Sequence, residues 1–141
     1  MTLRISETLL DEIRLHGERA YPAECCGLLA GRSSPIREVV RLRPMANRRI
    51  DDPHRYLISA EDLRSAAREV ELSELEVLGF YHSHPDHPAA PSAFDQEHAW
   101  PWYSYIIVRV DGARSGDIAS WVLQDDRSGM RSEPLDVFTE V

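Results

Sequence analysis

The residues with the clearest potential for chemistry lie between Tyr81 and Trp100, where the chain is YHSHPDHPAAPSAFDQEHAW. His82 and His84 stand two positions apart, and Asp95 follows them closely. Two neutral imidazoles and one carboxylate suit Zn²⁺, and three protein ligands leave a fourth position open for water. These donors therefore predict a catalytic site that binds one zinc ion per chain.

A strand is needed to carry the two histidines. The apolar run VLGFYHSH over 77–84 predicts that strand. Successive side chains of a strand point to opposite faces, so His82 and His84 share one face and Ser83 takes the other. Three prolines then stiffen the loop that leaves the strand, because proline fixes its own backbone torsion.

A short helix from about Ser92, ending before Pro101, is expected to supply the carboxylate. Ser92 and Asp95 are three positions apart, so they project on the same side of that helix. Serine is also a favoured N-cap and aspartate suits a first turn, so the pair is typical of an ordinary helix start. The full spacing H-x-H-x7-S-x2-D is more specific, with a chance match on the order of one in a few thousand.

A zinc hydrolase also needs a proton acceptor that does not bind the metal. The segment YPAECCGLLAGR (21–32) offers Glu24, at the mouth of an apolar strand where a carboxylate has no packing role. A glutamate before a strand is more often a solvated loop residue. Spacing alone therefore leaves the role of Glu24 open.

The two motifs together, PxE(C)CGLLxG near the N-terminus and HSHPxxxxxxSxxD, resemble the JAMM zinc isopeptidase family, also called JAB or MPN-plus. The likeness runs through nearly the whole chain and points to the compact, stand-alone prokaryotic branch. It implies that the zinc ligands are His82, His84 and Asp95. It further implies that Glu24 is the general acid/base and that Ser92 stabilises the oxyanion. The implied fold is α/β, a cytidine-deaminase-like JAB/MPN domain with a central mixed sheet flanked by helices.

The activity implied by this resemblance is hydrolysis of a peptide or isopeptide bond by a water that zinc activates. The substrate would be the C-terminal Gly-Gly tail of a ubiquitin-like, sulfur-carrier protein. Two other readings stay open. One is a non-catalytic MPN-type scaffold that only binds partners. The other is a zinc hydrolase of a small amide or dipeptide.

The remaining pattern predicts a single domain over 1–141. Ser6 is expected to cap a first helix that ends near Ala20, and Ser59 to cap a second helix with an apolar stripe. The other expected elements are strands at 25–31, 36–42, 103–110 and 118–124, an edge strand at 133–138 and a loop at 44–56.

Bulk properties exclude some classes of protein and suggest a compartment. A formal charge of −8 argues against a general nucleic-acid binder, which is usually basic. The chain lacks a signal-peptide core and any apolar run of membrane-spanning length, so we expect a cytoplasmic protein. Cys25 and Cys26 are adjacent and form a poor disulfide, which fits a reducing compartment and buried thiols. The oligomeric state stays open, with a homodimer as one option.

Several other residues have two alternative roles or a structural one. His87 and Asp86 either line a substrate groove or are plain loop residues. The arginine-rich segment 37–55 either steers an acidic partner or is a solvated face. Tryptophans 100, 102 and 121 are expected to pack in the core or at its edges.

Overall fold

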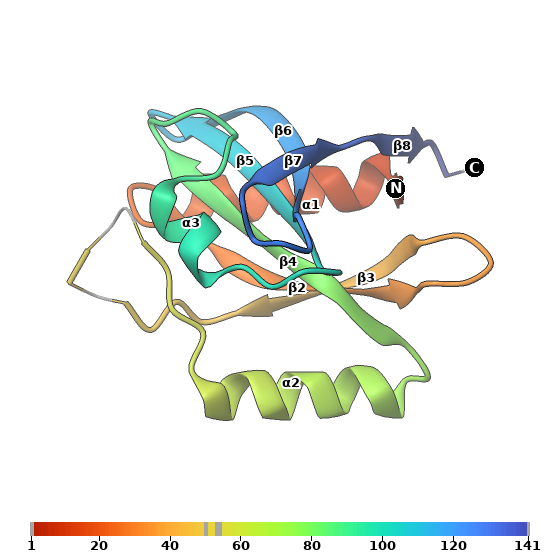
Figure 1. The fold of residues 1–141 in the computed structure, drawn as a ribbon. Helices are drawn as coiled ribbons and strands as arrows, with labels where there is room; N and C mark the ends of the chain where they lie inside the picture. Colours follow the sequence, from red (N-terminus) through yellow and green to blue (C-terminus); the bar gives the residue numbers. More distant parts are fainter. Residues whose placement is uncertain (1, 50, 53–54, 141) are drawn as a thin grey trace.

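The computed structural model describes residues 2–49, 51–52 and 55–140. Within these residues, strands form one mixed sheet in the order β7-β6-β5-β4-β2-β3-β1-β8, and helices pack against it (Figure 1). The elements in chain order are β1 (Leu3–Ser6), α1 (Glu7–Ala20), β2 (Cys26–Arg32), β3 (Glu38–Met45), α2 (Ala60–Leu72), β4 (Glu76–Pro85), α3 (Ala93–His98), β5 (Ser104–Asp111), β6 (Arg114–Leu123), β7 (Met130–Glu133) and β8 (Leu135–Phe138).

The two longer helices cover different faces of the sheet (Figure 1). Leu10 and Ile13 of α1 belong to the larger buried cluster, together with Tyr81 of β4. Ala66 of α2 belongs to a second cluster with Leu28 of β2. Both faces of the central strands are therefore buried, which explains why their sequences are almost continuously apolar.

The helix boundaries follow from capping residues, as the sequence predicts. The Ser6 hydroxyl accepts a hydrogen bond from Leu9 N at 3.1 Å, and the Ser59 hydroxyl accepts one from Asp62 N at 3.1 Å. Each bond satisfies a backbone N–H that has no partner inside its own helix. The first helix ends at Ala20, where it was expected to end.

The tail of the chain differs from the single edge strand predicted at 133–138. Pro134 alone separates β7 from β8, yet these strands lie at opposite ends of the strand order. The sheet must therefore curl until its two ends are linked by this one segment. Strand β1 was not predicted from the sequence. Its four residues form a parallel pairing with β8, in which Leu3 lies opposite Leu135, and a partner so distant in the sequence leaves no local signal.

The loop predicted at 44–56 begins later than expected. Strand β3 continues to Met45, and Pro44 lies within it, opposite Gly27 of β2. On its other side β3 pairs with β1 only near Glu38, so Pro44 sits where the strand is an edge. Proline is tolerated there because no neighbouring strand needs its N–H. Pro53, which falls within the predicted loop, lies outside the described residues.

Gly79 gives a test of how closely β4 and β5 approach. A Cβ atom at Gly79 would fall within van der Waals overlap of the Ser104 backbone, which cannot rotate away. We expect Gly79→Ala to lower the free energy of unfolding by about 1–3 kcal/mol or more, as overpacking does. Gly116→Ala is the matched control, because its nearest contact is 4.0 Å away. Equal denaturation midpoints for the two variants would contradict this view of the sheet.

Candidate metal centre

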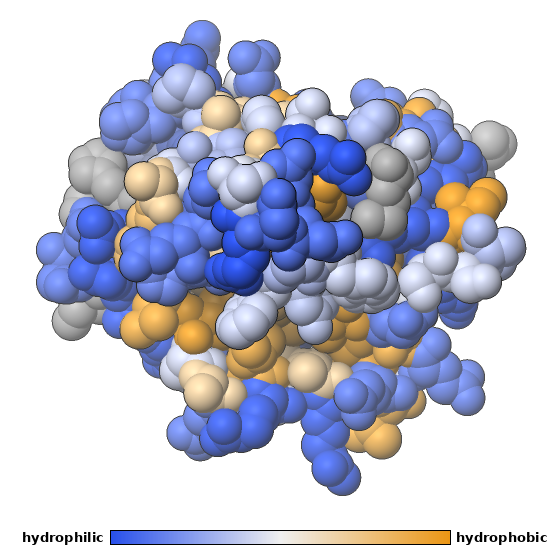
Figure 2. Space-filling view, viewed as in Figure 1, coloured by the Kyte–Doolittle hydropathy of each residue, from blue (hydrophilic) through white to orange (hydrophobic). Residues whose placement is uncertain are grey.

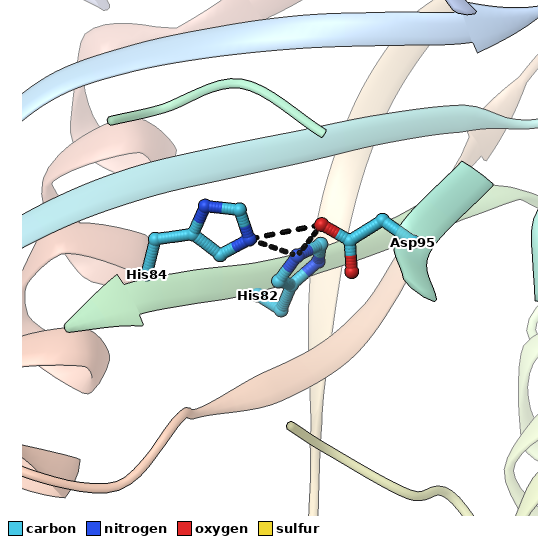
Figure 3. Close-up of side chains that lie close together, drawn as sticks. All are labelled: His82, His84 and Asp95. Atoms are coloured by element: carbon cyan, nitrogen blue, oxygen red, sulfur yellow. Dashed lines mark hydrogen bonds and ion pairs between the residues drawn. The ribbon is translucent and has the colours of Figure 1, made fainter. Parts of the chain in front are cut away.

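Strand β4 and helix α3 bring three donor atoms together (Figure 3). The Nε2 atoms of His82 and His84 lie 3.1 Å apart. Asp95 Oδ2 lies 2.9 Å from His84 Nε2 and 3.3 Å from His82 Nε2. A tetrahedral zinc ion with bonds of about 2.0–2.1 Å separates its donors by about 3.3 Å. The spacing of the three atoms therefore fits a metal ion of this kind.

The hydrogen bonding of His84 also favours a cation at this point. Its Nδ1 lies 2.8 Å from the carbonyl oxygen of Pro88, which can only accept, so Nδ1 carries the hydrogen. In the neutral ring, Nε2 then presents a lone pair toward the Asp95 carboxylate. Two acceptors face one another, and such an arrangement is favourable only with a proton or a metal cation between them.

Burial and pairing set the charges of this group. Burial lowers the pKa of His82, so its ring is neutral and able to act as a ligand. Burial opposes ionisation of Asp95, but its close polar contacts with His82 and His84 outweigh burial and hold the pKa of Asp95 far below its usual range. For His82 and Asp95, a neutral imidazole beside an ionised carboxylate is the protonation state that metal binding requires.

Glu24 lies two residues before the start of β2, which pairs with the strand that carries the histidines. Cys26 pairs with His82, and Ser83 N donates to Cys25 O at 3.2 Å, so the same register directs Glu24 toward His84. Glu24 is only 4% exposed, and its Oε1 is buried with no hydrogen-bond partner among the described residues.

Burial is the largest influence on Glu24 and raises its pKa from 4.5 to about 8. The nearby charge of His84 lowers this pKa, and that of Asp95 raises it. Glu24 therefore interacts electrostatically with the donor group without being one of its three members. A carboxyl group whose pKa lies near neutrality can both accept and return a proton.

Ser92 is the N-cap of α3, as its spacing predicts. Its Oγ accepts a hydrogen bond from Asp95 N at 3.0 Å, and Ser92 N donates to Asp95 Oδ2 at 3.0 Å. This reciprocal pair is a capping box, which fixes the carboxylate that faces the histidines. Because the Ser92 oxygen accepts this bond, its own hydrogen remains to donate elsewhere.

Other residues that the sequence analysis singled out are not members of the donor group. Cys25 and Cys26 are free and buried, and burial raises their pKa values to about 11 and about 12, as expected of core thiols. His87 is exposed on the loop after β4. Arg37 is buried and donates to the carbonyl oxygens of Leu78 and Trp102.

Most other arginines of the segment 37–55 form ion pairs with nearby carboxylates. The ion pairs are Arg43–Glu69, Arg48–Asp62, Arg49–Asp51 and Arg55–Asp52. Much of the segment's positive charge is therefore balanced locally.

Comparison with known proteins identifies the family of this chain. Residues 6–124 match the family model described as prokaryotic homologues of the JAB domain. The chain belongs to this family. None of the helices in the described part of this JAB chain is long and apolar enough to cross a membrane.

Curated relatives of this JAB chain include named proteases. It is 40% identical over 107 residues to the desampylase of Haloferax volcanii, covering 75% of this chain and 76% of the relative. It is 37% identical to a probable TtuB-protein conjugate cleaving protease of Thermus thermophilus, covering 82% and 75%. It is 29% identical to the CysO-cysteine peptidase of Mycobacterium tuberculosis, covering 96% and 90%.

Solved structures agree on the fold. A protein of Desulfitobacterium hafniense superposes with a TM-score of 0.84 at 28% identity, covering 99% of this chain and 94% of that one. A JAB1/MPN domain protein from Archaeoglobus fulgidus superposes with a TM-score of 0.62 at 22% identity, covering 97% and 99%. The predicted JAB/MPN fold is thereby confirmed.

The JAB site is bordered by an apolar pocket that sequence analysis did not identify. This pocket has a volume of about 280 Å³ and is lined by residues that include Tyr56, Phe80, Phe94, Trp100, Tyr105, His82 and Asp95. Figure 2 shows hydrophobic surface on this face, between α3 and α2.

Two aromatic residues of this pocket could not be placed from the sequence. The Tyr56 ring stacks on that of His82 with centroids 4.7 Å apart, yet Tyr56 comes from a proline- and aspartate-containing stretch without periodicity. Trp100, which was expected to pack in the core or at its edges, is 64% exposed and lines the pocket.

The raised pKa of Glu24 predicts a pH-dependent stability of the metal-free protein. The unfolded chain loses this proton near pH 4.5, whereas the folded protein keeps it to about pH 8. The folded state therefore binds more protons in this window, and the free energy of unfolding falls as pH rises through it. A tenfold change in proton affinity is worth about 1.4 kcal/mol, so the upper limit is about 5 kcal/mol.

Glu24→Gln removes this titration. We expect the chelator-treated variant to melt at a higher temperature than the wild type at pH 8, and the difference to shrink toward zero near pH 5. Glu97→Gln, on the exposed side of α3, is the control and should follow the wild type. Parallel melting curves of Glu24→Gln and wild type across this pH range would contradict the assignment.

Proposed function

We propose that this chain is a zinc hydrolase that cleaves a peptide or isopeptide bond after the C-terminal tail of a ubiquitin-like, sulfur-carrier protein. The observation that carries the proposal is the convergence of three ligand atoms beside a buried glutamate. His82, His84 and Asp95 would hold the ion. Glu24 stands next to them, and burial raises its pKa to about 8. The named relatives, a desampylase, a conjugate-cleaving protease and a CysO-cysteine peptidase, support the substrate class.

The chemistry divides between the ion and the protein. When bound, zinc supplies a Lewis acid that lowers the pKa of water and polarises the substrate carbonyl. Glu24 accepts the proton of the attacking water and returns it to the departing nitrogen. Ser92 donates its remaining hydrogen to the carbonyl oxygen as negative charge develops there.

The residues that line the apolar pocket indicate which side of the scissile bond binds there. Glu24 must face the departing nitrogen, because it delivers the proton to that atom. The described residues that line the pocket include His82 and Asp95 but neither His84 nor Glu24. We therefore place the tail of the carrier protein, which is the acyl side of the scissile bond, along this pocket.

Glu24→Gln tests the proposed function. We expect the variant to keep one zinc per chain and to lose about 10²–10⁴-fold in kcat on a ubiquitin-like substrate extended after Gly-Gly. Glu97→Gln should retain both zinc and activity. Wild-type protein without stoichiometric zinc would contradict the proposal and favour a scaffold. Cleavage of dipeptides but not of a protein tail would contradict the substrate class.

Ser92→Ala separates an oxyanion role from helix capping. Loss of one oxyanion donor should reduce kcat by about 10²–10³-fold. Loss of the cap alone should cost about 1 kcal/mol of stability. Ser59→Ala is the matched control, because it removes an equivalent cap from α2. An unchanged kcat in Ser92→Ala, with both variants equally destabilised, would reduce Ser92 to a helix cap.

A further inference from the structure

The loop at 86–91, called the ligand loop below, joins the two elements that carry the donors. His84 lies near the end of β4, before the loop, and Asp95 lies on α3, after the loop. The donor atoms nevertheless meet within about 3 Å of one another. A flexible connection would have many conformations, and a metal would have to order it on binding. What restrains the ligand loop therefore bears directly on the affinity of the site.

Asp86 anchors the first half of the ligand loop. Its carboxylate accepts a hydrogen bond from the Tyr21 hydroxyl at 2.7 Å and another from Gly112 N at 3.1 Å. Its own N–H donates to Val110 O at 2.8 Å. The backbone of Asp86 has a φ of 58°, in the left-handed region where aspartate, asparagine and glycine are favoured. This one residue thus ties the ligand loop to the segment after α1 and to the turn after β5.

Trp121 anchors the second half. Its indole Nε1 donates to Ala89 O at 3.0 Å from strand β6. Between the two anchors lies Pro88, whose carbonyl oxygen accepts the hydrogen of His84 Nδ1. A histidine that binds a metal through Nε2 is held in the right tautomer by such an acceptor on its other nitrogen. The position of this acceptor depends on a loop that is fixed on both sides.

We propose that Tyr21, Asp86 and Trp121 are positioning residues for the metal site. They hold the ligand loop so that Pro88 O fixes the His84 tautomer and α3 presents Asp95 to both histidines before any ion binds. This inference rests on the proposed zinc site. It assigns Asp86 to the framework of the site rather than to substrate contact, and it gives Trp121 a role beyond edge packing.

Zinc affinity, measured by competition with a chromophoric chelator, tests the proposal without reference to activity. Asp86→Gly suits the positive φ but removes both side-chain hydrogen bonds, whereas Asp86→Asn keeps an acceptor for Gly112 N. Partners that orient a metal ligand are typically worth 10–100-fold in metal affinity. We expect the zinc dissociation constant to rise roughly 10-fold in Asp86→Gly and to change by less than about 3-fold in Asp86→Asn. In the double variant Asp86→Gly with Trp121→Phe, it should rise about 100-fold.

Asp111→Asn is the matched control, because it removes the same charge from the end of β5, where Asp111 pairs with Arg109. It should leave zinc affinity unchanged. Melting of the chelator-treated proteins separates positioning from general stability, since a merely structural role lowers the melting temperature but not the zinc affinity. Wild-type affinity in Asp86→Gly and in the double variant would overturn this inference. Absence of zinc from the wild type would instead overturn the proposed function.

Discussion

Strands β2 and β4 pair antiparallel at the centre of the sheet, with Cys26 opposite His82, and this register decides what stands beside the candidate donor residues. It carries Glu24 to the edge of the donor group from a position almost sixty residues earlier in the chain. Because side chains alternate along a strand, a slip of one residue would exchange the faces of β2 and separate the two parts of the site. Gly27 supports this register, because a Cβ there would overlap the ring of Tyr81.

The pairing of β2 with β4, together with helix α3, places four ionisable side chains where water has little access. Glu24, His82 and His84 are buried, and Asp95 is partly buried. Removing such groups from water is costly unless each has a partner. The cost is offset by the capping box around Asp95, by the Pro88 carbonyl on His84 and by two large apolar clusters around the sheet. Two buried atoms of these side chains, Glu24 Oε1 and His82 Nδ1, have no hydrogen-bond partner among the described residues, and Glu24 lies beside the candidate donors of a metal.

The site places rigid donor residues next to an open apolar pocket. The histidines come from a central strand that has neighbours on both sides, so their backbone has little freedom. The wall opposite is built from α3 and from the segment that contains Tyr56, which leaves an apolar pocket next to His82 and Asp95. Catalytic sites need this combination, because ligands must be held to within about 0.5 Å while substrate still enters.

The sequence by itself determined the local parts of this protein. The spacing of His82 and His84 on a strand, the Ser92–Asp95 helix start and the caps at Ser6 and Ser59 all depend on neighbours within four residues, so residue types and periods suffice. Spacing could not place Glu24 at the site, and only the resemblance to a family suggested it.

Tertiary structure alone decided the remaining features. The pairing of Leu3 with Leu135 joins the two ends of the chain and depends on the whole sheet closing. The stacking of Tyr56 on His82, the burial that raises the pKa of Glu24 and the hold of Tyr21 on Asp86 likewise join distant segments. Such contacts leave no local period in the sequence, because their energy appears only when the complete fold excludes water from them.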